Sequence, residues 1–401
     1  MKRNNLLHII TATTFLILLL LLVLFPNNSF NAAKNGLYIW LNNVLPALLP
    51  FFFGSEILIG LGVIHFIGIL LEPIMQPIFN VPGIGSFIYT MSITSGYPMG
   101  TKIVSELRNR NLYSKEEGQR LLSLCSTSGP LFIIGSVSIG MFKNPYLGGL
   151  IAISHYLGSI ATGLTFRNYG NDRLRDLSWE SSKKQGPFQA LYQARIEDGR
   201  KLGILLGDAA RNSINTLLII GSFIIFFSVL TELLSIINFF ELFCLFLSPL
   251  LSIFNVSEEL IKGLLSGILE ITNGANIISK TSDPLLIKGI FTSFIIAWGG
   301  FSIHAQAISF ISKTDLRIMP YLLGKLIHGI YSSILFYILL RLSIELDIPT
   351  PVFNHYIQPF ISYSWLNLLF LGSILFLSTI STLIFTGLLV LILNKNRILH
   401  K

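Results

Sequence analysis

Two apolar segments of the chain are interrupted by glycine, proline and small polar residues, and the first interruption spans residues 94–102. Gly96 and Gly100 permit unusual backbone dihedrals, and Pro98 lacks a backbone donor. Such an interruption unwinds a helix and exposes the N–H groups that begin the next half-helix, which form an anion site. Lys102 adds a positive charge beside it. The alternative is a loop that simply ends a helix, with Lys102 as an ordinary surface charge.

The second interruption, residues 270–276, contains a carboxylate inside an apolar segment. An ionisable residue at membrane depth is costly and is a candidate for function by default. Glu270 could therefore bind a coupling cation or a proton, while Asn273 and Asn276 could orient a polar substrate. The alternative is a glutamate whose carboxylate is satisfied by a neighbouring helix or lies at the membrane interface.

A further pair of interruptions falls at residues 126–130 and 298–306. His304 and Gln306 are informative here, because a polar side chain in an apolar stretch must find a partner. Small residues also mediate plain helix packing, so glycines alone indicate little. The residues expected to bind a substrate are therefore Ser95, Gly96, Tyr97, Lys102, Ser128, Gly129, Glu270, Thr272, Asn273, Gly274, Asn276, Gly299, Gly300, His304 and Gln306, with no catalytic residue and no metal ligand among them.

Three more polar residues, His155, Lys325 and His328, lie on the segments that follow these interruptions. A single histidine on an apolar helix is more often a packing residue than a ligand, so these three are weaker candidates.

The elements that position these residues are apolar helices. Only 12% of the 401 residues are charged, against about 25% in a soluble domain, and the mean hydropathy is +0.69. Stretches of 18 or more apolar residues are typical of membrane spans. The sequence predicts an all-α polytopic membrane protein with about ten transmembrane helices, at 8–25, 36–60, 62–78, 121–142, 146–166, 213–236, 238–254, 286–311, 319–342 and 364–394. The segments 83–101 and 260–279 are either full spans or re-entrant hairpins.

The distribution of charge predicts the orientation. Residues 167–212 are rich in arginine and lysine, which places them in the cytosol by the positive-inside rule, whereas residues 342–362 contain no Lys or Arg and are expected outside. The same rule accounts for the net charge of +8, so no nucleic-acid partner is expected. The apolar run at 8–25 is too long for an ordinary signal peptide and lacks a cleavage motif, which favours a retained helix. Cys125 and Cys244 lie in apolar segments and predict neither a disulfide nor a metal site.

The two halves of the chain share landmarks in the same order. The tetrapeptide Ile-Phe-Asn-Val occurs at 78–81 and again at 253–256, and interruptions follow each copy. Biased composition is the alternative explanation. Matched interruptions in two halves are typical of a transporter's binding site. The expected organisation is an N-terminal helix at 1–35, repeat halves at 36–166 and 213–342, a basic linker at 167–212, and an external loop with a final helix at 343–401.

Enzyme signatures are absent from the sequence, including nucleotide-binding loops and metal-binding histidine motifs. The chain is therefore expected to be neither an enzyme nor a cofactor protein. Any transport would be driven by an ion gradient or by the gradient of the substrate, because no ATP-binding domain is present.

The interruptions also carry a resemblance to a known family. The motifs are S-G-Y-P-x-G-x-K at 95–102, S-K-E-E at 114–117, S-G-P-L-F-I-I-G at 128–135, E-I-T-x-G at 270–274 and W-G-G-F-S-I-H-x-Q at 298–306. Over roughly residues 36–340 the chain resembles the YlbJ (SpoVV) family of sporulation integral membrane proteins. That family belongs to the nucleoside-recognition (Gate) group, whose repeats are similar to those of concentrative nucleoside transporters.

The resemblance implies a role in spore formation, in the outer forespore membrane, with dipicolinic acid as the transported anion. Helix N-termini and Lys102 would then hold its two carboxylates, and Tyr97 or Trp298 could stack on its ring. Two alternatives stay open, a membrane scaffold for the spore envelope that transports nothing and a nucleoside permease. Besides the small organic anion, membrane lipid and a coupling cation or proton are the expected partners.

Overall fold

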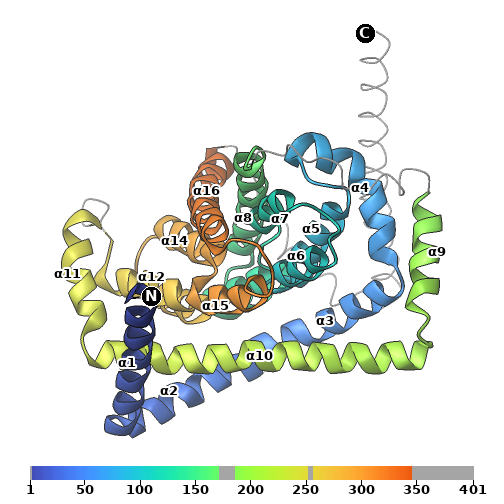
Figure 1. Ribbon diagram of the computed structural model, residues 1–401. Helices are drawn as coiled ribbons and strands as arrows, with labels where there is room; N and C mark the ends of the chain where they lie inside the picture. The colour runs from blue at the N-terminus through green and yellow to red at the C-terminus, as the bar shows by residue number, and fades with distance from the viewer. Residues whose placement is uncertain (1, 171–185, 252–255, 346–401) are drawn as a thin grey trace, which may run out of the picture.

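The computed structural model describes residues 2–170, 186–251 and 256–345, and this part of the chain is entirely helical (Figure 1). The predicted C-terminal helix at 364–394 and part of the predicted basic linker lie outside the described residues. The prediction of an all-α fold is confirmed. Most of the predicted helices within the described residues fall on observed ones, but those at 121–142 and 286–311 are each divided in two. Continuous apolar runs of this length have few other ways to satisfy their backbone.

Two long helices form a scaffold beneath the rest of the molecule (Figure 1). One is α10 (Leu202–Ile236), and the other runs through α2 (Pro26–Ile39), the π-helical turn η1 (Trp40–Val44) and α3 (Leu45–Gly60). At 1.5 Å per residue, α10 is about 52 Å long, which exceeds a hydrocarbon core of about 30 Å. Helix α10 is therefore longer than a single upright crossing requires.

Close contacts fix the pairing of these two scaffold helices. The Trp40 indole donates to the Leu217 carbonyl oxygen at 3.1 Å, and a Cβ added to Gly221 would lie 2.5 Å from the Trp40 ring. A glycine at position 221 is thus what allows the tryptophan to pack against α10. Trp40, Val44, Phe52, Leu217, Ile220 and Ile224 form a separate apolar core between the helices.

Three helices stand together in the centre of the molecule: α8 (Pro145–Phe166), α14 (Leu285–Trp298) and α16 (Ile318–Glu345) (Figure 1). Glycines permit their close approach. A Cβ added to Gly158 would lie 2.5 Å from the Ser332 hydroxyl, and one added to Gly289 would lie 2.1 Å from the Phe336 ring. Small residues at such crossings are the usual means by which membrane helices pack.

The segment at 260–279 is a helical hairpin. The sequence had left two alternatives for this segment, a full span or a hairpin. Helix α12 (Glu258–Leu269) turns at Glu270 into α13 (Ile271–Lys280). Gly274 lies against Gly267, and Gly263 lies against Ile278, so the two helices run antiparallel with almost no space between their backbones.

The matching segment at 83–101 is divided into α5 (Ile84–Ser95) and α6 (Met99–Asn109), which are joined by residues 96–98. Gly96 has a φ of +75°, and the Tyr97–Pro98 peptide bond is cis. Ser92 and Gly100 meet beside this turn, where an added Cβ on Gly100 would lie 2.7 Å from the serine hydroxyl.

Two further helices are interrupted partway. Helix α7 (Lys115–Leu124) is followed after residues 125–130 by the π-helix η2 (Leu131–Phe142), and α14 passes through Gly299 into α15 (Gly300–Ile311). Gly299 has a φ of +92°. Helix α7 begins with a capping box, since the Ser114 hydroxyl accepts from the Glu117 N–H at 3.2 Å and the Glu117 carboxylate accepts from the Ser114 N–H at 2.7 Å. The helix leads directly into the interruption at 125–130.

The remaining helices lie around this bundle: α1 (Lys2–Leu24), α4 (Val63–Phe79), α9 (Pro187–Asp198) and α11 (Phe239–Leu251). Within the described residues, four segments are long and apolar enough to span a membrane: Pro145–Phe166, Leu202–Ile236, Leu285–Ile311 and Ile318–Ile344. A fifth span results if Ala12–Leu24 and Pro26–Asn42, bent by 101°, are counted as one. The count of about ten stays a prediction, since bends and interruptions divide the apolar runs into shorter helices.

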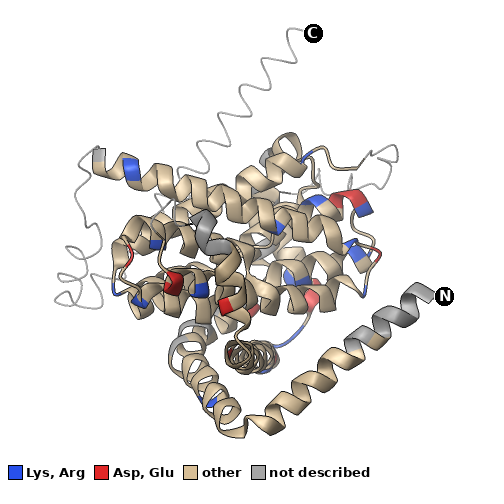
Figure 2. Cartoon of the chain, turned by 90° about the vertical axis from the view of Figure 1, so that its left-hand side faces the viewer, with Lys and Arg blue, Asp and Glu red and all other residues tan. Residues whose placement is uncertain are grey.

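Charged residues are sparse along the ribbon (Figure 2). Both cysteines are free and buried, as expected. The chain is thus an all-helical, polytopic membrane protein in which four helical elements are interrupted.

The contact between α12 and α13 predicts a specific sensitivity to side-chain size. A Cβ on Gly274 would lie 2.2 Å from the Gly267 Cα, so Gly274→Ala should destabilise the protein by about 1–3 kcal/mol through overpacking. Gly207→Ala is the matched control, because nothing lies within 4 Å of an added Cβ there and alanine favours a helix. Thermal unfolding in detergent should show a lower midpoint for the first variant only, and equal midpoints would contradict the packing described.

Candidate functional site

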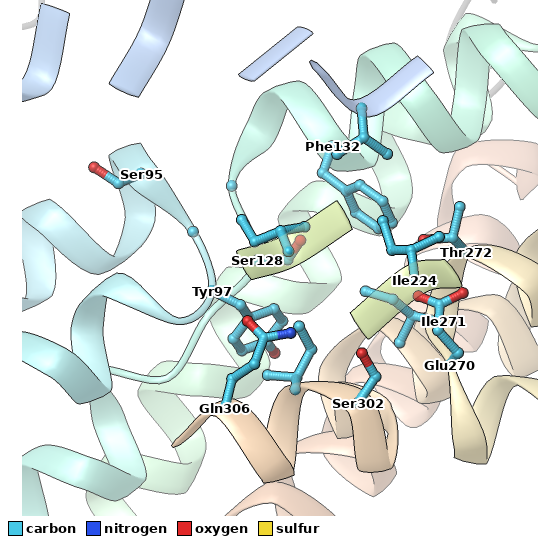
Figure 3. Close-up of a pocket in the computed structure, with 15 residues that line it drawn as sticks. Ser95, Tyr97, Ser128, Phe132, Ile224, Glu270, Ile271, Thr272, Ser302 and Gln306 are labelled. Atoms are coloured by element: carbon cyan, nitrogen blue, oxygen red, sulfur yellow. The ribbon is translucent and has the colours of Figure 1, made fainter. Parts of the chain in front are cut away.

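All four interruptions meet at one buried cavity (Figure 3). Its volume is about 50 Å³, which is room for roughly three or four water molecules. Its polar wall comes from the interruptions, and its apolar wall is completed by the scaffold helices. The lining residues are Val44, Ser95, Gly96, Tyr97, Ser128, Gly129, Phe132, Ile220, Ile224, Glu270, Ile271, Thr272, Ser302, Ile303 and Gln306.

Each interruption brings the start of a half-helix to this cavity. Helix α6 begins at Met99, η2 at Leu131, α13 at Ile271 and α15 at Gly300, and residues of each interruption line the cavity. A helix N-terminus carries unpaired N–H groups and about half a positive charge. N–H donors of this kind lie near a cavity whose wall contains no basic side chain.

Glu270 is the single ionisable carboxylate in the cavity wall, and only 1% of its surface is exposed. Its Oε2 accepts from the Asn273 N–H at 2.8 Å, so the side chain caps the start of α13. The N–H and hydroxyl of Thr272 also approach it. Among the described residues no lysine, arginine or histidine forms an ion pair with it, so its carboxyl oxygens pair with N–H groups at the start of α13 and with the Thr272 hydroxyl.

The interruption at 125–130 is held by side chains from three other helices. The Ser128 N–H donates to His155 Nε2 at 2.9 Å, and the Tyr156 hydroxyl donates to the Ser128 carbonyl oxygen at 3.1 Å. The Thr127 N–H donates to the Ser92 hydroxyl at 3.1 Å. Non-helical backbone at membrane depth survives only where such partners satisfy it.

Lys325 completes this set of backbone partners. Its Nζ donates to the Ser126 carbonyl oxygen at 2.8 Å and to the Tyr97 hydroxyl at 2.5 Å. The Tyr97 hydroxyl in turn donates toward the Ile296 and Ala297 carbonyl oxygens, at 3.1 and 3.2 Å. Three of the four interruptions are therefore joined by one lysine and one tyrosine.

Two polar groups of lining residues have no protein partner within the described part of the chain, namely the Ser95 hydroxyl and Gln306 Oε1. A buried polar group without a partner costs about 1–3 kcal/mol. In Figure 3, Gln306 lies close to Tyr97, across the cavity from Glu270 and Thr272. These groups are suited to bind water or a polar solute.

The cavity contains eight of the fifteen residues expected from the sequence: Ser95, Gly96, Tyr97, Ser128, Gly129, Glu270, Thr272 and Gln306. Ser302 lines it as well and was not among the expected residues. It lies within the interruption at 298–306, so the sequence pattern included it, but a serine at a helix start usually has a local role. The apolar contribution of Val44, Ile220 and Ile224 had no sequence signal.

The other seven expected residues lie away from the cavity wall. Asn273 points to α10, where its Nδ2 donates to the Ser228 hydroxyl at 3.0 Å. His304 Nδ1 pairs with the Tyr321 hydroxyl at 3.1 Å, and its ring packs edge-on to Trp298. The remaining five, which are not lining residues, are Lys102, Gly274, Asn276, Gly299 and Gly300.

Lys102 instead lines a second cavity of about 640 Å³. This space lies between α3, α4, the α5–α6 pair, α9 and α10. Its ionisable lining residues are Glu56, His65, Lys102, Glu106, Arg110 and Glu197. Because acidic and basic side chains are mixed there, and Lys102 lies 4.0 Å from the Glu106 carboxylate, this larger cavity has no clear preference for anions.

Comparisons with known proteins show what this chain is similar to. Residues 41–144 match the Gate family, described as "Nucleoside recognition". The Bacillus subtilis (strain 168) protein "Sporulation integral membrane protein YlbJ" is 42% identical over 341 residues, which cover 83% of each chain. A solved structure of a doubly substituted CNTnw in an outward-facing state covers 84% of this chain and 87% of its own. Its TM-score is 0.43 at 14% identity, a likeness too low to support any conclusion.

Fold and site together define a multi-pass membrane protein with a central cavity built from interrupted helices. The chain belongs to the family of the sporulation integral membrane protein YlbJ. The family expected from the sequence motifs is therefore confirmed.

The hydrogen-bond partners of residues 125–130 indicate that the site depends on His155. His155→Ala leaves the Ser128 N–H without its acceptor, so we expect a loss of about 1–3 kcal/mol in stability. The control is His65→Ala, at an exposed position on α4, which should change stability by less than about 0.5 kcal/mol. Thermal unfolding in detergent measures both, and an unchanged midpoint for His155→Ala would show that this interruption does not need its side-chain partner.

Proposed function

We propose that this protein is a secondary transporter or facilitator that carries a small organic anion through the cavity at the four interruptions. The observation that supports the proposal is the convergence of four half-helix N-termini on one buried space in a membrane protein. Helix N-termini bind anions through their N–H groups and dipoles, and interrupted helices of this kind form the binding sites of secondary transporters.

The charges around the cavity explain how an anion would be accepted. Four N-termini supply about half a positive charge each, and Glu270 opposes them with one negative charge. Binding a proton or a coupling cation at Glu270 would remove that opposition. An anion would then meet N–H and hydroxyl donors alone, so Glu270 is the residue through which an ion gradient would drive uptake.

The size of the cavity supports alternating access. Its volume of about 50 Å³ holds a few waters, so an organic anion needs the interrupted helices to move apart on one side. Both expected repeat halves contribute to the wall, since Ser95 to Phe132 come from the first half and Glu270 to Gln306 from the second. Relative motion of the halves would open the cavity to one side at a time.

Dipicolinate is our proposed substrate, and the outer forespore membrane is our proposed location. A relative named as a sporulation protein supports a sporulation solute, and dipicolinate is a flat dianion of the class that the site suits. Its carboxylates would face the half-helix N-termini, and the Tyr97 ring, which is part of the wall, would lie against its ring.

A nucleoside is the second candidate substrate, favoured by two observations. The Gate family is described as "Nucleoside recognition", and the wall contains the amide and hydroxyls of Gln306, Thr272 and Ser302. Such neutral groups suit the hydroxyls of a sugar. A protein that transports neither solute would fit the remaining alternative, a scaffold for the spore envelope.

The test is uptake of labelled dipicolinate and labelled nucleosides by proteoliposomes that contain the purified full chain. We expect dipicolinate uptake by the wild type and at least a tenfold loss in Glu270→Gln, because the amide keeps the shape of the cap on α13 but cannot exchange a proton or bind a cation. Glu258→Gln is the matched control, since this glutamate is exposed in the first turn of α12, and it should transport normally.

The outcomes separate the candidates. Uptake of nucleosides but not of dipicolinate would make a nucleoside the substrate. Uptake of neither solute would favour a protein that supports the spore envelope and transports nothing. Full dipicolinate uptake by Glu270→Gln would exclude the proposed role of this carboxylate.

A further inference from the structure

Lys325 is a buried lysine with no acidic partner among the described residues. Only 1% of its surface is exposed, and no salt bridge to it is found in the part of the chain that the structure describes. The ionisable groups that face it are aromatic or imidazole groups, Tyr97, His155, His304 and His328. A charged side chain at membrane depth normally pairs with an opposite charge or with backbone carbonyls, and here the pairing is to oxygen atoms alone.

The oxygen atoms around the Lys325 ammonium belong to different interruptions. The Ser126 carbonyl oxygen lies 2.8 Å from Nζ, and the Tyr97 hydroxyl lies 2.5 Å from it. The Tyr97 ring also lies beneath the ammonium, with its centroid 4.4 Å away. At a third interruption, a Cβ added to Gly299 would be 3.7 Å from the Lys325 Cε. The side chain thus extends from α16 into the point where three interruptions meet.

This environment matches the chemistry of a monovalent metal cation. Unwound backbone carbonyls coordinate Na⁺ in transporters with interrupted helices, and carbonyl oxygens replace the hydration shell of K⁺ in channels. An ammonium group has the same charge and accepts the same oxygen partners through its N–H groups. At Lys325 the ammonium pairs with one such carbonyl oxygen, that of Ser126, and with the Tyr97 hydroxyl.

We propose that the Lys325 ammonium acts as a tethered monovalent cation that joins the interruptions at Tyr97, Ser126 and Gly299, in the place that a bound metal ion would otherwise take. This junction therefore needs no dissolved cation to hold it together. Lys325 is a positioning residue, since it contacts the cavity only through Tyr97. The inference does not depend on which solute is transported.

The proposal has a consequence that a merely structural hydrogen bond would not have. Lys325→Ala removes the cation and leaves a space lined by the Ser126 carbonyl and the Tyr97 hydroxyl. Na⁺ with its water ligands can then occupy that space. Lys325→Met removes the charge as well but fills the space, so Na⁺ cannot enter.

The experiment measures the thermal midpoint of the full chain in detergent, in NaCl and in N-methyl-D-glucamine chloride at equal ionic strength. All variants carry Glu270→Gln, so that a cation bound at that carboxylate cannot contribute. With Lys325 intact, the midpoint should be the same in both salts. The midpoint of Lys325→Ala should be lower by roughly 5 °C or more in N-methyl-D-glucamine chloride, and increasing Na⁺ should restore it to a plateau. The midpoint of Lys325→Met should also be lower, and Na⁺ should not restore it.

The control for general salt effects is Lys288→Ala. Lys288 also donates to two backbone carbonyl oxygens, of Ser279 and Thr281, at 2.9 and 2.8 Å, but it lies in the first turn of α14, away from the interruptions. Its variant should not respond to Na⁺.

Two results would overturn the proposal. One is a Lys325→Ala protein that is destabilised equally in both salts or not destabilised at all. The other is a saturable Na⁺ stabilisation of the protein that retains Lys325, which would mean that a dissolved cation still binds there. The second measurement decides the matter if Lys325→Ala yields no folded protein.

Discussion

The structure depends on one constraint, that peptide groups released by an interrupted helix inside a membrane must find partners in the protein. At residues 125–130 those partners are side chains of Ser92, His155, Tyr156 and Lys325. They come from three separate helices, so the interruption can form only when those helices are already assembled. The polar residues of this otherwise apolar chain are concentrated where the backbone needs them.

That constraint also explains the shape of the site. Turning a helix back at Glu270, or bending one at Gly299, brings the start of the next half-helix to the same place. Close backbone contact, as between Gly267 and Gly274, keeps these half-helices in position. The scaffold helices close the cavity with Ile220 and Ile224. Backbone geometry therefore brings helix N–H donors and a single carboxylate, Glu270, to one cavity.

Much of this architecture could be predicted from the sequence. Apolar run length gave the helices, and the glycines and prolines at 96–100 and 299–300 marked the interruptions, because those residues alter backbone geometry locally. The sequence could not predict which residues of the interruptions face the cavity. Lys102 and Asn273 have the right chemistry but turn toward Glu106 and Ser228. Ser302 and Lys325 are placed by contacts between distant helices, for which local pattern carries no signal. The matching of the two halves as a repeat stays a prediction.

The most direct test of the central claim, that the cavity at the interruptions is the path of the solute, is a cysteine-block measurement at Ser302. Ser302→Cys is made in a chain carrying Cys125→Ala and Cys244→Ala, treated with a small thiol reagent, and assayed for dipicolinate uptake in proteoliposomes. The account predicts that labelling stops uptake and that excess dipicolinate slows the labelling. Ser309→Cys, at an exposed position on the same helix, should be labelled without loss of dipicolinate uptake. Unchanged uptake by fully labelled Ser302→Cys protein would contradict the account.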